Sequence, residues 1–238
     1  MLYNIPMPLA DTRLRFDQTW GKYVFSTGIF LRTRWRFYMG KKKFFSSRQI
    51  TGLAVLLALV IVLQLFGGYI RIGATPISLV LVPIVLAGTL YGATAGAILG
   101  FAFGVVVLLQ GIVGVDAFTM ILFNDHPLWT ALLCLGKGTA AGFFSGLAYK
   151  MVARKNEYVG TFAASVVAPL VNTGLFILGA LCFLQDTLKA NFIDGTSVIY
   201  FLVIVCAGVN FLIELAINLI ATPSIYRVLG IIKGKKRK

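Results

Sequence analysis

Long apolar runs constrain this chain more than any other feature of its sequence. A helix needs about 20 mostly apolar residues to cross the roughly 30 Å hydrocarbon layer of a membrane. Five runs reach that length: Ile50–Tyr69, Ala93–Val113, Leu128–Tyr149, Val159–Phe183 and Val198–Thr222. A sixth run, Ile77–Tyr91, is shorter and is interrupted by Pro83, so we interpret it as a short or kinked span. The sequence therefore predicts an all-α polytopic membrane protein, a compact bundle of six transmembrane helices within residues 48–225.

Charge predicts how these helices are oriented. Only 13% of the residues are charged, compared with about a quarter in a soluble domain. The basic residues outnumber the acidic ones, with 22 Lys and Arg and eight Asp and Glu. Most of the basic residues lie in the first 48 residues, after the fourth span and in the C-terminal tail. The positive-inside rule then places all three segments, and both termini, in the cytoplasm. Topology and anionic lipid account for the net charge of +14 without a nucleic-acid partner.

Two basic segments flank the membrane domain. Residues 1–47 are predicted to form a cytoplasmic N-terminal extension, and residues 226–238 a cytoplasmic tail. Within the extension, Met39 begins MGKKKFFSSRQITG, which is typical of the start of an inner-membrane protein. We therefore expect translation to begin at Met39, or the first 38 residues to be poorly ordered.

Glycines at four-residue spacing predict close helix packing. One row comprises Gly88, Gly92, Gly96, Gly100 and Gly104, and a second comprises Gly138, Gly142 and Gly146. This spacing places glycines on one helix face, where they let another backbone approach closely. Both rows are interpreted as packing faces of the bundle.

Lys137 lies between two glycines in the apolar run LLCLGKGTAAGFFSG. A Walker phosphate loop is excluded, because Ala131 stands where its first glycine is required. Trp129 is expected to anchor the membrane interface and to contribute to a substrate-binding site. Counted from Trp129, Lys137 lies about 12 Å deep. A charge at the centre of a membrane helix costs about 2.5–3.5 kcal/mol, so Lys137 should face the bundle interior or a watered cavity. The alternative is a lysine that caps backbone carbonyls where Gly136 and Gly138 loosen the helix.

Polar residues of the last two spans lie at a similar depth. Asn172 is near the middle of the fifth span, and Asn210, Glu214 and Asn218 share one face of the sixth because they are four residues apart. An ion pair between Glu214 and Lys137 would need a tilted helix. Each asparagine alone could instead join two helices. Their convergence with Lys137 favours a substrate-binding site.

The first outer loop, GGYIRIGATP, offers two further candidates. Tyr69 supplies a stacking ring and Arg71 a cation, and the loop could close over a ligand, although it could also be an ordinary turn. Lys137 and Arg71 favour a substrate with a carboxylate or phosphate, whereas the asparagines and Glu214 would suit a neutral ring system. The sequence leaves this choice open.

A basic N-terminus and an AxxxA pair, Ala54 and Ala58, come before two longer segments. These segments are TPISLVLVPIVLAGTLYGATAGAILGFAFG (75–104) and LCLGKGTAAGFFSGLAYK (133–150). Over about residues 45–225 this pattern resembles the substrate-binding S component of energy-coupling factor (ECF) transporters, in the group of riboflavin, pantothenate and folate carriers. The resemblance implies high-affinity capture of a vitamin at the outer face of a prokaryotic plasma membrane. It also implies docking through Ala54 and Ala58 on a transmembrane T subunit that carries two ABC-type ATPases.

The resemblance further implies that the chain has no cofactor of its own, because its partners hydrolyse ATP. The single histidine, His126, has no nearby thiols, so no metal site is expected, and no nucleophile–base pair indicates an enzyme. Two alternatives remain: a stand-alone small secondary transporter, although no repeat relates residues 50–113 to 128–222, or an assembly subunit of a membrane complex.

Overall fold

The computed structural model describes residues 45–67, 71–72, 75–76, 79–193 and 197–234. Its contacts divide the chain into two units, Met1–Ser46 and Ser47–Lys238. The predictions for the N-terminal extension and for a start at Met39 lie outside the described residues. The second unit contains all the helices and strands that follow.

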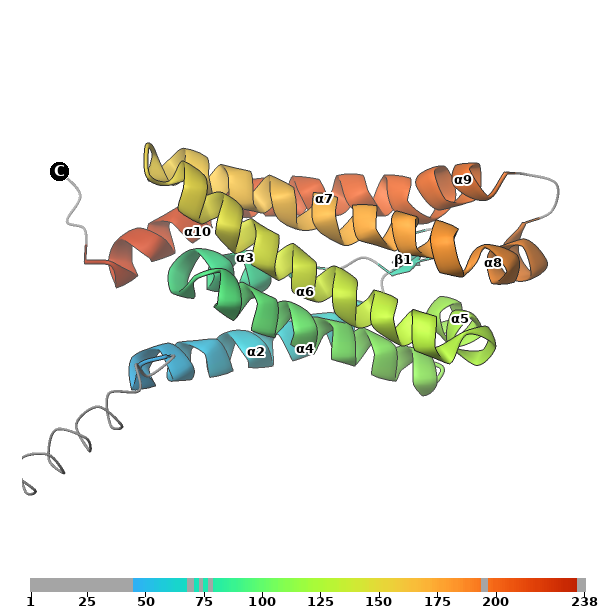
Figure 1. The fold of residues 1–238 in the computed structure, drawn as a ribbon. Coiled ribbons are helices and arrows are strands. Elements are labelled where there is room, and N and C mark those ends of the chain that lie inside the picture. Colours follow the sequence, from blue (N-terminus) through green and yellow to red (C-terminus); the bar gives the residue numbers. More distant parts are fainter. Residues whose placement is uncertain (1–44, 68–70, 73–74, 77–78, 194–196, 235–238) are drawn as a thin grey trace, which may run out of the picture. The chain divides into compact units, whose positions relative to one another are not determined.

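This unit is built almost entirely of helices (Figure 1). They are α2 (Ser47–Gly67), α3 (Leu81–Tyr91), α4 (Ala93–Ile112), α5 (Ala117–Asp125), α6 (Pro127–Val152), α7 (Glu157–Phe183), α8 (Gln185–Phe192), α9 (Val198–Tyr200), the π-helix η1 (Phe201–Gly208) and α10 (Val209–Ile232). Two short strands, β1 (Arg71–Ile72) and β2 (Thr75–Pro76), pair antiparallel between α2 and α3. The all-α prediction is confirmed. The short helices α5 and α8 were not predicted.

Five helical segments are long and apolar enough to cross a membrane: α2, α4, α6, α7 and the continuous run from Val198 to Ile232. The chain is therefore a multi-pass membrane protein. The sixth predicted segment forms α3, which has only 11 residues and is mostly buried against its neighbours. At 1.5 Å per residue it covers about half of the hydrocarbon layer.

The interpretation of the run Ile77–Tyr91 as a short span is confirmed, although Pro83 does not interrupt α3. Pro83 lies in the first turn of α3, where a backbone N–H has no helical partner, so proline removes no hydrogen bond there. Gly92, which lies between the two apolar runs, separates α3 from α4 with a φ of 98°. A positive φ is readily adopted only by glycine. Gly92 therefore belongs to a turn and not to the glycine packing row.

The remaining glycines bring α4 and α6 into backbone contact where the two helices cross (Figure 1). A Cβ atom added to Gly96 would lie 2.3 Å from the carbonyl oxygen of Gly142, and one added to Gly100 would lie 2.0 Å from that of Gly138. Real Cβ atoms do not approach a backbone this closely, so only glycine fits. Apart from Gly92, the predicted packing role of these two rows is confirmed.

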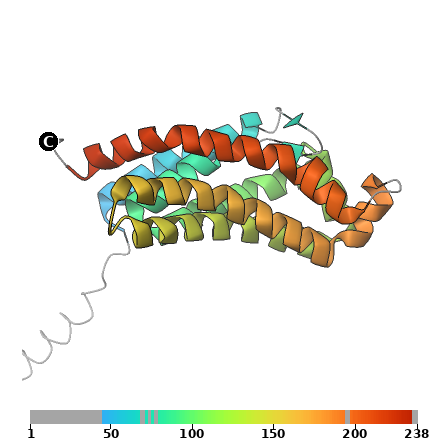
Figure 2. The same ribbon diagram turned by 90° about the horizontal axis from the view of Figure 1, so that it is seen from above.

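The last helical run packs along α7 (Figure 2). It extends to Ile232, ten residues beyond the predicted end at Thr222, and continues through Pro223. After α9, it contains the π-helix η1, an uncommon conformation that frequently marks functional sites. The helix that it packs along, α7, also contains an interior proline, Pro169.

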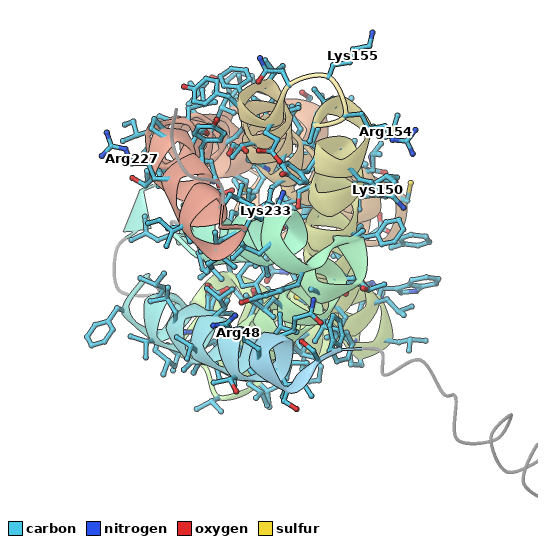
Figure 3. The ribbon with its side chains drawn as sticks, turned by 90° about the vertical axis from the view of Figure 1, so that its left-hand side faces the viewer. Arg48, Lys150, Arg154, Lys155, Arg227 and Lys233 are labelled. Atoms are coloured by element: carbon cyan, nitrogen blue, oxygen red, sulfur yellow. The ribbon has the colours of Figure 1, made fainter. Side chains whose placement is uncertain are left out.

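Basic side chains gather at one end of the bundle (Figure 3): Arg48, Lys150, Arg154, Lys155, Arg227 and Lys233. Lys233 joins three helices there, because its Nζ donates to the Tyr149 hydroxyl at 2.8 Å and lies 3.3 Å from Glu157 Oε1. Burial alone would lower the pKa of Lys233, but these partners raise it above its usual value. The cytoplasmic placement of this end stays a prediction.

Candidate functional site

A cavity lies between α2, α4, α5, α6, α7 and the last helical run. The space open to the centre of a water molecule measures about 80 Å³, room for several waters or part of a small organic molecule. Four of the predicted site residues line it: Lys137, Asn172, Asn210 and Glu214. The predicted convergence of these polar groups is therefore observed.

Lys137 and Asn172 belong to the wall formed by α6 and α7. The half-buried Lys137 places its Nζ 5.0 Å from the ring centroid of Phe176, one turn beyond Asn172 on α7. An ammonium over an aromatic face gains about 0.5–2 kcal/mol. The ion pair between Lys137 and Glu214 that the sequence suggested for a tilted helix is not among the described contacts. Lys137 lines the cavity and is not turned toward lipid, which agrees with the expected cost of a charge at this depth.

The last helical run contributes a second wall. Asn210 and Glu214, both buried, lie one turn apart at the start of α10, and Cys206 comes from η1. Asn210 Nδ2 donates to the Cys206 carbonyl at 3.3 Å. Two further polar residues of the same face, Asn218 and Thr222, lie beyond the cavity. Asn218 donates to the Glu214 carbonyl at 2.8 Å, so its contact is made within the helix.

The third wall, formed by α2, α4 and α5, was missed in the sequence analysis. Gln64 Nε2 donates to Gln110 Oε1 at 2.8 Å, which links α2 to α4. Asp116 precedes α5, and its carboxylate accepts a hydrogen bond from the Thr119 hydroxyl. Gln64, Asp116 and Thr119 line the cavity. The available signal was the presence of a single glutamine in each of two otherwise apolar spans.

Aromatic side chains of the cavity wall belong to a larger aromatic cluster. Phe118 on α5 packs against Phe176 on α7 and Phe192 on α8, with ring centroids 6.1 and 5.1 Å apart. Phe192 stacks in turn on Phe201 of η1. The two unpredicted short helices therefore contribute Phe118 and Phe192 to this aromatic cluster. Phe118 and Phe176 line the cavity directly.

The other predicted site residues are not placed in the cavity. Trp129 is 40% exposed and stacks on Phe183 with ring centroids 4.0 Å apart, outside the lining. Tyr69 lies outside the described residues, and for Arg71 only the backbone, within β1, is described. Ala54 and Ala58 are exposed on α2.

A comparison with protein families identifies this architecture. The family model described as "ECF transporter, substrate-specific component" matches residues 48–226. The chain belongs to this family. The match runs from the start of α2 to Tyr226 on α10, so the ECF substrate-specific component includes every helix that lines the cavity. The resemblance noted from the sequence is thereby confirmed. No curated protein matches the chain.

Proposed function

We propose that this ECF substrate-specific component binds a water-soluble vitamin or a similar small molecule with high affinity in the prokaryotic plasma membrane. The observation that supports this proposal is the cavity, because it is partly enclosed by aromatic rings and lined by polar groups at membrane depth. Ionisable residues inside membrane segments commonly mark substrate pathways. Pockets of this composition also suit small organic ligands.

Four side chains are assigned to the substrate. Lys137 would bind an acceptor group of the substrate, while Asn172, Asn210 and Glu214 would form hydrogen bonds from the facing walls. Phe176 would pack against an apolar or ring part of the molecule, since it already borders Lys137. No step of chemistry is needed from these residues, because the substrate is carried unchanged.

The proposal also assigns a partner to α2. Its inner side buries Leu56, Val60 and Gln64, whereas Ala54 and Ala58 are exposed on the opposite side. Two small residues one turn apart allow close approach of another helix without requiring charge. We assign this face to the T subunit of the transporter, which would carry two ABC-type ATPases that supply the energy of import. The chain itself would then use no cofactor.

Native mass spectrometry of the protein extracted gently from its own membrane tests this proposal. We expect a mass increment that matches a vitamin, or T and ATPase subunits that purify with the chain. A chain without partners that also ignores a panel of added vitamins would contradict the proposal and favour a stand-alone transporter or an assembly subunit.

A further inference from the structure

We propose that the wall formed by α2, α4 and α5 recognises a nitrogen group that donates hydrogen bonds, such as a protonated amine, an amidine or an amino-substituted ring. The inference rests on the proposed function, because it names the chemistry of the substrate that the same cavity would bind. It is carried by Gln64 and Asp116, neither of which was recognised from the sequence.

The hydrogen bonds of Gln64 determine which end of its amide is left without a partner. Gln110 Nε2 donates to the backbone oxygen of Gln64 at 3.3 Å, so the other end of the Gln110 amide, Oε1, can only accept. Oε1 accepts from Gln64 Nε2 at 2.8 Å. Gln64 Oε1 is therefore left as an acceptor. Gln64 is 3% exposed, and this oxygen has no hydrogen-bond partner among the described residues.

Asp116 supplies a second acceptor on the same wall. Its backbone N–H donates to the Gln110 carbonyl at 3.1 Å, which holds it at the end of α4 where the two glutamines meet. One carboxylate oxygen, Oδ2, accepts from Thr119, while Oδ1 is buried without a partner within the described part of the chain. Asp116 is only 6% exposed. A buried carboxylate is costly unless it is paired, and a donor nitrogen would offset that cost.

The charges of the cavity are divided between its walls. The described lining includes one lysine, Lys137, on α6, and two acids, Asp116 before α5 and Glu214 on α10. Asn172 can present either the oxygen or the NH₂ group of its amide, so it favours neither hydrogen-bond donors nor acceptors on the substrate. A substrate whose polar groups are all carboxylates or phosphates would suit Lys137 but would be repelled by the carboxylate of Asp116. A substrate with a donor nitrogen on the Gln64–Asp116 side satisfies the acceptors there and leaves Lys137 for an acceptor group.

Matched probe pairs test this inference on the full-length protein in mild detergent. Each pair shares a ring and differs in its charged group: tryptamine with indole-3-acetate, histamine with imidazole-4-acetate, and pyridoxamine with 4-pyridoxate. We expect an amine to raise the unfolding temperature more than its matched acid. The dissociation constant of that amine should rise at least tenfold in Asp116→Asn and stay unchanged in Asp125→Asn. Asp125 is a matched control, because it is exposed at the far end of the same short helix.

Two results would overturn the inference: stabilisation by the acids that Asp116→Asn does not weaken, or no stabilisation by any amine. If either result is obtained while the wild-type protein carries a small-molecule mass increment from its own membrane, this inference fails and the proposed function stands. If no increment and no probe binding are found, both fail. If Asp116→Asn does not fold, the wild-type protein still tests the inference. The test is then whether each amine raises the unfolding temperature more than its matched acid.

Discussion

Two rows of residues at four-residue spacing behave differently along their lengths. The glycine row of α4 and α6 has one role throughout, since Gly96, Gly100 and Gly104 all meet the α6 backbone. The polar row of α10 divides: Asn210 and Glu214 line the cavity, whereas Asn218 and Thr222 lie beyond it. Glycine has no side chain whose role could vary with its surroundings. A polar side chain takes its role from whatever the facing helix leaves open.

The largest effect should come from a side chain placed in the glycine row. Gly142→Leu would push atoms into the carbonyl of Gly96, because even a Cβ at residue 142 would lie 2.0 Å from that oxygen. Overpacking of this kind costs about 3 kcal/mol or more, so we expect a protein that unfolds readily or fails to accumulate. Thermal unfolding in detergent measures the loss.

Gly136→Leu is the matched control on the same helix. A Cβ there would meet no described atom within 4 Å, and the exposed position faces away from α4. Its unfolding temperature should equal or exceed that of the wild type, since leucine is the better helix former. Equal damage from both substitutions would show that close contact does not explain the glycine row.

A third small-residue row, Ala54 and Ala58 on α2, sharpens the comparison because its proposed partner lies outside the chain. Ala58→Trp should abolish transport while the dissociation constant of the substrate stays unchanged. Ile98→Trp, at an exposed position of α4, should preserve both. Uptake into cells and binding to purified protein give the two readouts. Loss of binding in a folded Ala58→Trp protein would refute the docking role.

Lys137 tests whether a residue adjacent to the glycine row belongs functionally to the cavity. Lys137→Ala should weaken substrate affinity at least tenfold, about 1.4 kcal/mol, because it removes the cation from the cavity wall. Lys150→Ala, exposed near the end of the same helix, should leave affinity unchanged. Calorimetric titration measures both. An unchanged constant in Lys137→Ala would assign the lysine to structure alone.

The sequence predicted the features that depend on local spacing. Apolar length located the five long spans, and glycine spacing identified the α4–α6 contact. It did not predict α5 and α8, because both helices are short and are held by tertiary contacts such as Phe118 with Phe192. Gln64 and Asp116 were missed because their role depends on a junction of α2, α4 and α5 that distant segments form.

The smallest effect should come from the lower part of the polar row. Thr222 Oγ1 donates to Ser165 Oγ at 2.9 Å, a hydrogen bond between α10 and α7 with both residues fully buried. Thr222→Val keeps the shape and should lower stability by about 0.6 kcal/mol, the average for hydrogen bonds between membrane helices. Substrate affinity should not change. Asn210→Leu, about three turns closer to the cavity, should do the reverse and weaken binding with little loss of stability. The two positions share one helix face. A binding defect in Thr222→Val would therefore show that the polar row is a single functional unit, and that it does not divide between Glu214 and Asn218.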